Sequence, residues 1–114
     1  MSKRKTYTIF LSEDDRIDVD LEFERRTTGR AARLHRFAIT YSARIREAWR
    51  EVIRYDNFHG FLHRQPYWRS NAPERLALRG RPSLERAVDR CREDLRRNWR
   101  RYRSLMERKE GGHE

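Results

Sequence analysis

Residues 16–26 read RIDVDLEFERR, and their alternation of apolar and charged side chains decides the fold class. The apolar residues all have odd numbers: Ile17, Val19, Leu21 and Phe23. The residues between them are acidic. Because successive side chains of a β-strand point to opposite faces, the stretch predicts a half-buried strand with an acidic outer face.

Other extended segments lie on both sides of this strand. The sequence indicates them near residues 7–11, 34–43, 48–56 and 61–68. In the third of these, Trp49, Ile53 and Tyr55 are expected on one side of the strand. Pro66 restricts the last segment to a sheet edge or ends it. Since the connections are short, we expect an antiparallel meander of four to five strands over residues 5–69.

The periodicity changes after Pro82. Apolar residues then recur every three or four positions from Leu84 to Met106, which is typical of an amphipathic helix. Ser83 is a suitable N-cap. We expect a loop over residues 70–82, a basic helix over residues 83–109 and a disordered tail over residues 110–114. The fold class is therefore α+β, a single domain over residues 1–114 with the helix packed on one face of the sheet.

The charge predicts a polyanionic partner. The formal net charge is +10 over 114 residues, and most of the cationic side chains are arginine. Arginine's planar guanidinium suits phosphate and stacks on bases, so nucleic acid, RNA above all, is the expected partner. A GC-rich coding bias would also enrich arginine. Cys91, the single cysteine, fits a reducing compartment, and TIFL (residues 8–11) is too short an apolar run for a membrane span. We expect a cytoplasmic protein with no membrane contact.

Residues 54–64, RYDNFHGFLHR, form the candidate site. Asp56, Asn57 and Gly60 by themselves predict a turn between two strands. A catalytic hypothesis adds a second role for this stretch: His59 and His63 would act as acid and base, with Asp56 orienting one imidazole. Arg54 and Arg64 would stabilise a phosphorane-like transition state. Such a set could cleave RNA without metal, because the ribose 2′-hydroxyl supplies the nucleophile.

A zinc site is an alternative for the same residues. His59 and His63 are four positions apart, and Asp56 or His35 could be a third ligand. This spacing favours ligation on a helix, whereas Gly60 indicates a hairpin. We therefore expect no metal and no other cofactor.

Further contacts to nucleic acid are expected outside this stretch. Tyr67 and Arg69 flank Trp68 in an arrangement that suits stacking on single-stranded RNA. Arg97 and Arg101 lie at helical spacing and could form a cationic rail for phosphates. Two alternatives remain open for the helix: a solvated face with ion pairs such as Glu93 with Arg97, or a surface that pairs with the acidic strand face of a second copy in a homodimer.

The segment VIRYDNFHGFLHR (residues 52–64), followed by a basic C-terminal helix, resembles the TumE-like group of small prokaryotic toxins. It also resembles uncharacterised families with the pattern RYD-x-x-HG-x-x-HR. The resemblance covers roughly residues 33–68. Tyr55, Asp56 and Asn57 match the first part of the toxin motif, and His59 and His63 correspond to its histidine-rich second part without the Pro-His-His run. The resemblance implies a toxin that acts on RNA and is paired with an antitoxin, here expected to be acidic. The alternative is a non-catalytic basic subunit or adaptor of a phage or defence assembly.

Overall fold

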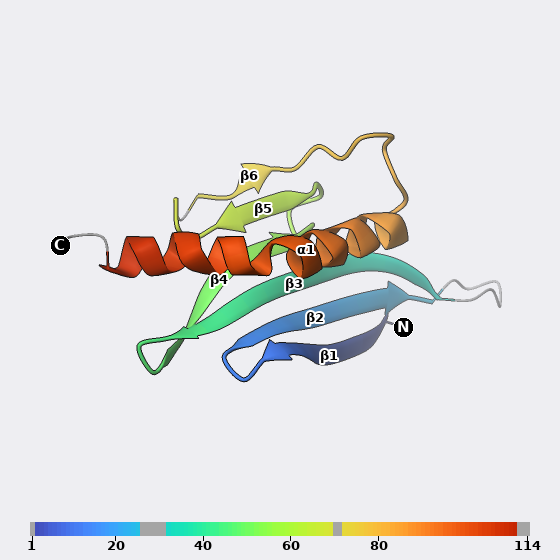
Figure 1. The fold of residues 1–114 in the computed structure, drawn as a ribbon. Helices are drawn as coiled ribbons and strands as arrows, with labels where there is room; N and C mark the ends of the chain where they lie inside the picture. Colours follow the sequence, from blue (N-terminus) through green and yellow to red (C-terminus); the bar gives the residue numbers. More distant parts are fainter. Residues whose placement is uncertain (1, 26–31, 70–71, 112–114) are drawn as a thin grey trace.

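The computed structural model describes residues 2–25, 32–69 and 72–111 of the chain. Within them, six antiparallel strands form one sheet in sequence order, and a single helix lies across one of its faces (Figure 1). The strands are β1 (Ser2–Ser12), β2 (Asp15–Glu24), β3 (Arg33–Ile45), β4 (Ala48–Asp56), β5 (His63–Pro66) and β6 (Glu74–Arg75). The helix is α1 (Leu84–Gly111). The α+β meander with a C-terminal helix is confirmed, with a slightly higher strand count than expected.

The core lies between the sheet and α1. Alternate residues of β2 and β3 face the helix and are sealed from solvent, as in Ile17 and Ile39, which are both 0% exposed. The helix contributes Leu95 to this layer. Cys91, on the same helix face, is 2% exposed and belongs to the core as well. Burial raises the pKa of its thiol to about 12, so the sulfur stays protonated at neutral pH.

A β-bulge in β4 changes which side chains face the core. Tyr41 pairs with Ile53 and Ser42 pairs with Glu51, so Val52 is an extra residue on β4. An extra residue reverses the inward–outward alternation beyond it. Trp49 is consequently 37% exposed and lies against the Arg16 guanidinium, at 4.2 Å from the ring centroid. The expectation that it shares a side with the buried Ile53 was wrong.

The helix begins where the sequence places it and ends later. The Ser83 hydroxyl accepts a hydrogen bond from the Arg86 amide at 3.3 Å, as expected of an N-cap. The helix continues through Glu110, whose carboxylate lies 3.6 Å from Arg50, to Gly111. The tail expected from residue 110 was therefore placed two residues early, and the rest of it lies outside the described residues.

A short strand replaces part of the expected loop. In β6, Arg75 pairs with His63 and Glu74 pairs with Arg64. The Leu76 amide donates to the Leu62 carbonyl at 2.9 Å just beyond this pairing. The reason is that β5 still had an unpaired backbone edge, which the returning chain satisfies.

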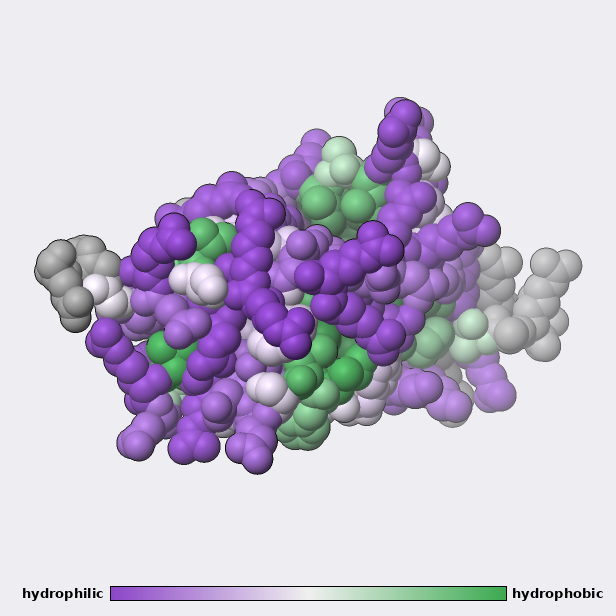
Figure 2. Space-filling view, in the orientation of Figure 1, coloured by the Kyte–Doolittle hydropathy of each residue, from purple (hydrophilic) through white to green (hydrophobic). Residues whose placement is uncertain are grey.

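Hydrophilic residues cover most of the face shown in Figure 2, with small hydrophobic patches between them. The principal dimensions are 60 × 28 × 22 Å. No helix among the described residues is both long and apolar enough to cross a membrane.

Candidate nucleic-acid interface

The β4–β5 hairpin places the predicted site on the face of the sheet that the helix leaves uncovered. Asp56 pairs directly with His63, and Tyr55 pairs with Arg64. Side chains opposite each other in a ladder share a face, and neighbours along a strand do not. Tyr55 reaches Asp94 on α1, so Arg64 shares the helix face and Asp56 shares the open face with His63.

Asn57 holds the loop of this hairpin against β3. Its side-chain oxygen accepts a hydrogen bond from the Phe37 amide at 2.9 Å, and its amide nitrogen donates to the His35 carbonyl at 3.0 Å. Gly60 has a φ of 85°, a conformation that side chains with a Cβ rarely adopt. The turn signals in the sequence therefore have a direct structural role.

A hydrogen-bonded carboxylate lies at the base of the loop. Asp56 accepts from Arg54 Nε at 2.9 Å and from the Phe58 amide at 3.0 Å. His63 Nδ1 lies 3.6 Å from the same carboxylate. Burial is the largest single influence on the pKa of Asp56 and acts to raise it, but the two hydrogen bonds and the positive charge of Arg54 together lower the pKa below its ordinary value of 3.8. Asp56 is therefore an anion at neutral pH.

The two predicted histidines converge. The rings of His59 and His63 meet edge to face, with their centroids 5.3 Å apart. Their exposure differs, since His63 is 6% exposed whereas His59 lies on the surface. The Phe61 ring also covers His63, at 4.2 Å between centroids. In the described part of the chain, His63 Nδ1 has no hydrogen-bond partner. Solvent therefore reaches this pair mainly at His59.

Two exposed phenylalanines flank the histidines, and sequence reasoning missed both. Phe58 is 40% exposed and Phe61 is 39% exposed. Arg36 lies over the Phe58 ring at 4.4 Å and Arg75 over the Phe61 ring at 4.5 Å, measured from the guanidinium carbon to the ring centroid. The sequence did contain a signal for their exposure. Both phenylalanines lie in a turn with Asp56, Asn57 and Gly60, and apolar rings in such a turn are seldom buried.

The expectation that Arg64 joins this patch was wrong. Its guanidinium lies near the hydroxyls of Tyr55 and Tyr102 on the helix side, and 3.8 Å from Glu74. The cause is strand alternation, which separates Arg64 from the adjacent His63 by the thickness of the sheet. Arg54, by contrast, lies where it was expected.

The family model described as "Domain of unknown function (DUF7718)" matches residues 1–112, almost the whole chain. The chain belongs to the DUF7718 family. No curated protein and no solved structure matches it.

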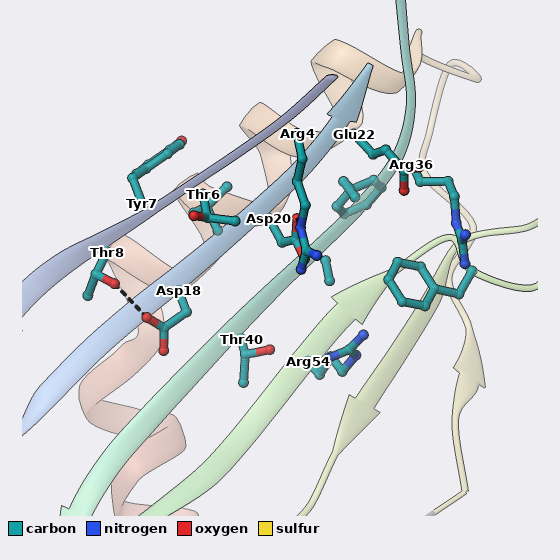
Figure 3. Close-up of a pocket in the computed structure, with 14 residues that line it drawn as sticks. Arg4, Thr6, Tyr7, Thr8, Asp18, Asp20, Glu22, Arg36, Thr40 and Arg54 are labelled. Carbon is teal, nitrogen blue, oxygen red and sulfur yellow. Dashed lines mark hydrogen bonds and ion pairs between the residues drawn. The ribbon is translucent and has the colours of Figure 1, made fainter. Parts of the chain in front are cut away.

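The DUF7718 chain has a hollow of about 800 Å³ on the open face of its sheet, next to the hairpin (Figure 3). Arg36 and Thr40 of β3 line the hollow together with Arg54 of β4 (Figure 3). Phe58, in the hairpin loop, also lines it. The β2 side carries Asp18, Asp20 and Glu22, so this strand has the acidic outer face that its sequence predicted. Acidic side chains there are already paired, as in Asp20 with Arg4 at 2.5 Å.

Tyr67 and Arg69, just after the end of β5, have different neighbours. The Tyr67 hydroxyl is half-buried beside Glu51, close enough to Arg54 and Asp56 for their charges to act on it. Burial and the Glu51 carboxylate raise its pKa. Arg69 instead pairs with Glu74 at 3.2 Å. Trp68, between them, stacks on Tyr102 of α1 at 5.2 Å and belongs to the helix side.

Arg97 and Arg101 lie on α1, on the other side of the sheet from the histidines. The Arg97 side chain is 75% exposed and bonds Glu93 at 2.7 Å, the ion pair that the sequence suggested. Arg101 is also exposed. The expected phosphate contacts therefore form two separate surfaces of the DUF7718 chain, one on the hairpin and one on the helix.

The described residues hold no group of three or more His, Cys, Asp or Glu side chains arranged to bind a metal ion. His35, considered as a third ligand, lies 3.6 Å from Glu22.

Proposed function

We propose that this chain binds single-stranded RNA through the loop of the β4–β5 hairpin. The observation that supports it is the surface made by Phe58, His59 and Phe61, three exposed rings in four residues, with guanidinium groups against both phenylalanines. Aromatic faces interleaved with arginine suit unpaired bases and the phosphates that join them.

Duplex nucleic acid fits this loop less well. Bases in a duplex are stacked on one another, and only unstacked bases offer a face to a protein ring. The overall charge of +10 would attract either form from a distance, and this attraction falls as salt rises. Arg36 and Arg75 are exposed beside the rings, where they can meet phosphate.

The test is the affinity for a fluorescently labelled, unstructured RNA, measured by anisotropy over a series of salt concentrations. Phe58→Ala and Phe61→Ala should each weaken binding by about tenfold, the value of one lost stacking contact. Trp49→Ala is the matched control, since Trp49 is 37% exposed with the Arg16 guanidinium against its ring and lies at the opposite end of β4 from the hairpin loop. Equal affinity of all three variants and the wild type would contradict the proposal.

We further propose that the bound RNA is cleaved without metal, as in a toxin. The contact between His59 and His63, with Asp56 behind it, supports this second step. His59 would take the proton of a ribose 2′-hydroxyl, whose oxygen then attacks the adjacent phosphorus. A 2′,3′-cyclic phosphate forms, the bond to the 5′-oxygen breaks and that oxygen takes the proton back from the His59 imidazolium. The low exposure of His63 supports a positioning role for this imidazole, which would hold the His59 ring through their edge-to-face contact.

A toxin of this kind would work in the prokaryotic cytoplasm, which the single, buried Cys91 suits. Its antitoxin would be an acidic protein that covers exposed arginines of the hairpin or the helix.

The second candidate function is that of a non-catalytic basic subunit of a larger assembly. The observation that favours it is the exposed position of Arg97 and Arg101 on a helix remote from the hairpin. In that case the double variant Arg97→Glu and Arg101→Glu would abolish binding to the rest of the assembly. The double variant Phe58→Ala and Phe61→Ala would leave this binding unchanged.

A further inference from the structure

The first strand presents a free edge. β1 is the outermost strand of the sheet, and it is 11 residues long, paired on one side with β2. No described element lies along its other side (Figure 1). A long edge strand offers a row of backbone N–H and C=O groups to another strand, and proteins usually guard such edges with charge.

Charged side chains protect only half of this edge from pairing with another strand. Residues 3–5 are Lys, Arg and Lys, whereas residues 7–11, YTIFL, carry none. Phe10 is 68% exposed, the highest value among the large hydrophobic residues described. Tyr7, Ile9 and Leu11 are only partly buried against the core. The uncharged half therefore combines open backbone groups with incompletely covered apolar side chains.

The two ends of the edge have opposite charge. Lys3, Arg4 and Lys5 lie at its start, and the exposed Glu13 and Asp14 follow its end. A strand that is basic at one end and acidic at the other is complementary to a second copy running antiparallel to it. A two-fold axis near the middle of the strand would bring the basic end of each copy beside the acidic end of the other, with the apolar segments meeting between them.

We propose that two copies of this chain pair through β1 and form a homodimer with one continuous sheet of twice six strands. The contact is isologous, so it closes and does not propagate into fibres. The Arg4–Asp20 ion pair lies on the open face and leaves the strand edge itself unobstructed. The hairpin with His59 lies at the far end of the meander in each copy, so the proposal is independent of RNA binding.

The test is the molar mass in solution, measured by light scattering and sedimentation over a range of concentrations. We expect twice the mass of the chain, 14.1 kDa, with dissociation on dilution. Phe10→Lys should raise the dissociation constant about tenfold or more, because the Phe10 ring would no longer be buried in the contact.

A charge-exchange experiment identifies the register. One variant carries Lys3→Glu and Lys5→Glu, and the other carries Glu13→Lys and Asp14→Lys; all four side chains are exposed, so the fold should persist. Each variant alone places like charges together and should be monomeric. An equal mixture of the two should dimerise, because each end then meets its opposite charge. Arg86→Glu and Glu85→Lys, on exposed positions of α1, are the matched controls and should remain dimeric.

Two results would overturn the proposal. One is a wild-type chain that is monomeric at every concentration. The other is a dimer that survives Phe10→Lys and both charge variants but dissociates when Asp18 and Arg97 are reversed, which would indicate pairing of the acidic sheet face with the basic helix.

Discussion

The imidazole rings of His59 and His63 lie edge to face, 5.3 Å apart, with one ring on the surface and the other beneath it. The Asp56 carboxylate lies 3.6 Å from His63 Nδ1. His63 therefore lies close to both a half-buried carboxylate and a solvent-exposed imidazole. This difference in exposure predicts that the two histidines contribute differently to the proposed cleavage.

This relationship predicts unequal effects on RNA cleavage. In the presence of EDTA, His59→Ala should abolish cleavage, because it removes the imidazole that solvent reaches. His63→Ala should reduce cleavage but leave RNA affinity unchanged, since the ring lies beneath the surface. Product analysis on a labelled RNA would follow both. Activity that disappears in EDTA for the wild type, or that persists in both variants, would reject metal-free cleavage by this pair.

The Asn57 side chain should be a major source of stability for the hairpin. Asn57→Ala leaves the Phe37 amide and the His35 carbonyl without their partner, so the free energy of unfolding should fall by about 1–3 kcal/mol. Urea denaturation followed by tryptophan fluorescence measures this. Ser104→Ala, on an exposed position of α1, should change stability little. Equal effects of the two substitutions would show that the Asn57 hydrogen bonds do not contribute significantly to the free energy of unfolding.

Asp56 should make stability depend on acid pH. Its pKa is lower in the folded chain than the ordinary 3.8, so it stabilises the fold above that pH, and the contribution is lost as the pH falls through the lowered value. The difference in free energy of unfolding between wild type and Asp56→Asn should therefore be largest near neutrality and shrink below about pH 4. Asp89→Asn, with a 66% exposed side chain, is the control. A difference that grows on acidification would have the wrong sign.

Asp94 joins α1 to β4 through buried hydroxyls. It accepts hydrogen bonds from Tyr55, from Tyr102 at 2.8 Å and from Asn98 at 2.9 Å. Asp94→Ala should cost about 3 kcal/mol in the free energy of unfolding, because it leaves buried donors unsatisfied. Asp89→Ala, which removes an exposed carboxylate from the same helix, should cost less than about 1 kcal/mol. Chemical denaturation of both variants measures these two losses in the free energy of unfolding, and equal losses would contradict the prediction.

The buried carboxylate of Asp15 should make Arg103 more important for stability than any exposed helix arginine. Arg103 donates to Asp15 at 2.8 Å, and the Asp15 side chain is 4% exposed. Arg103→Met would leave this charge without its cation, at a cost of about 3–5 kcal/mol. Arg97→Met, which breaks only a surface pair, should cost less than about 1 kcal/mol. Thermal unfolding would show a large drop for the first variant alone; a similar melting temperature for both would contradict the assignment.

The sequence predicted the elements whose side-chain pattern is local. The alternation around Ile17 gave β2 and its acidic outer face, and the spacing from Leu84 to Met106 gave α1 with Ser83 as its cap. These predictions succeeded because a strand's period of two and a helix's period of 3.6 are properties of the backbone itself. For the candidate site, Asp56, Asn57 and Gly60 indicated a turn, and a turn brings His59 near His63.

Sequence by itself thus determined the fold class, the helix, the turn and the excess of positive charge. The tertiary structure alone decided that Trp49 lies away from the core, that Arg64 joins the helix side and that Phe58 and Phe61 stay exposed. The physical reason is that each of these depends on pairing between strands. A bulge at Val52 exists only relative to β3, and the face occupied by Arg64 is fixed only once Tyr55 lies opposite it and reaches α1.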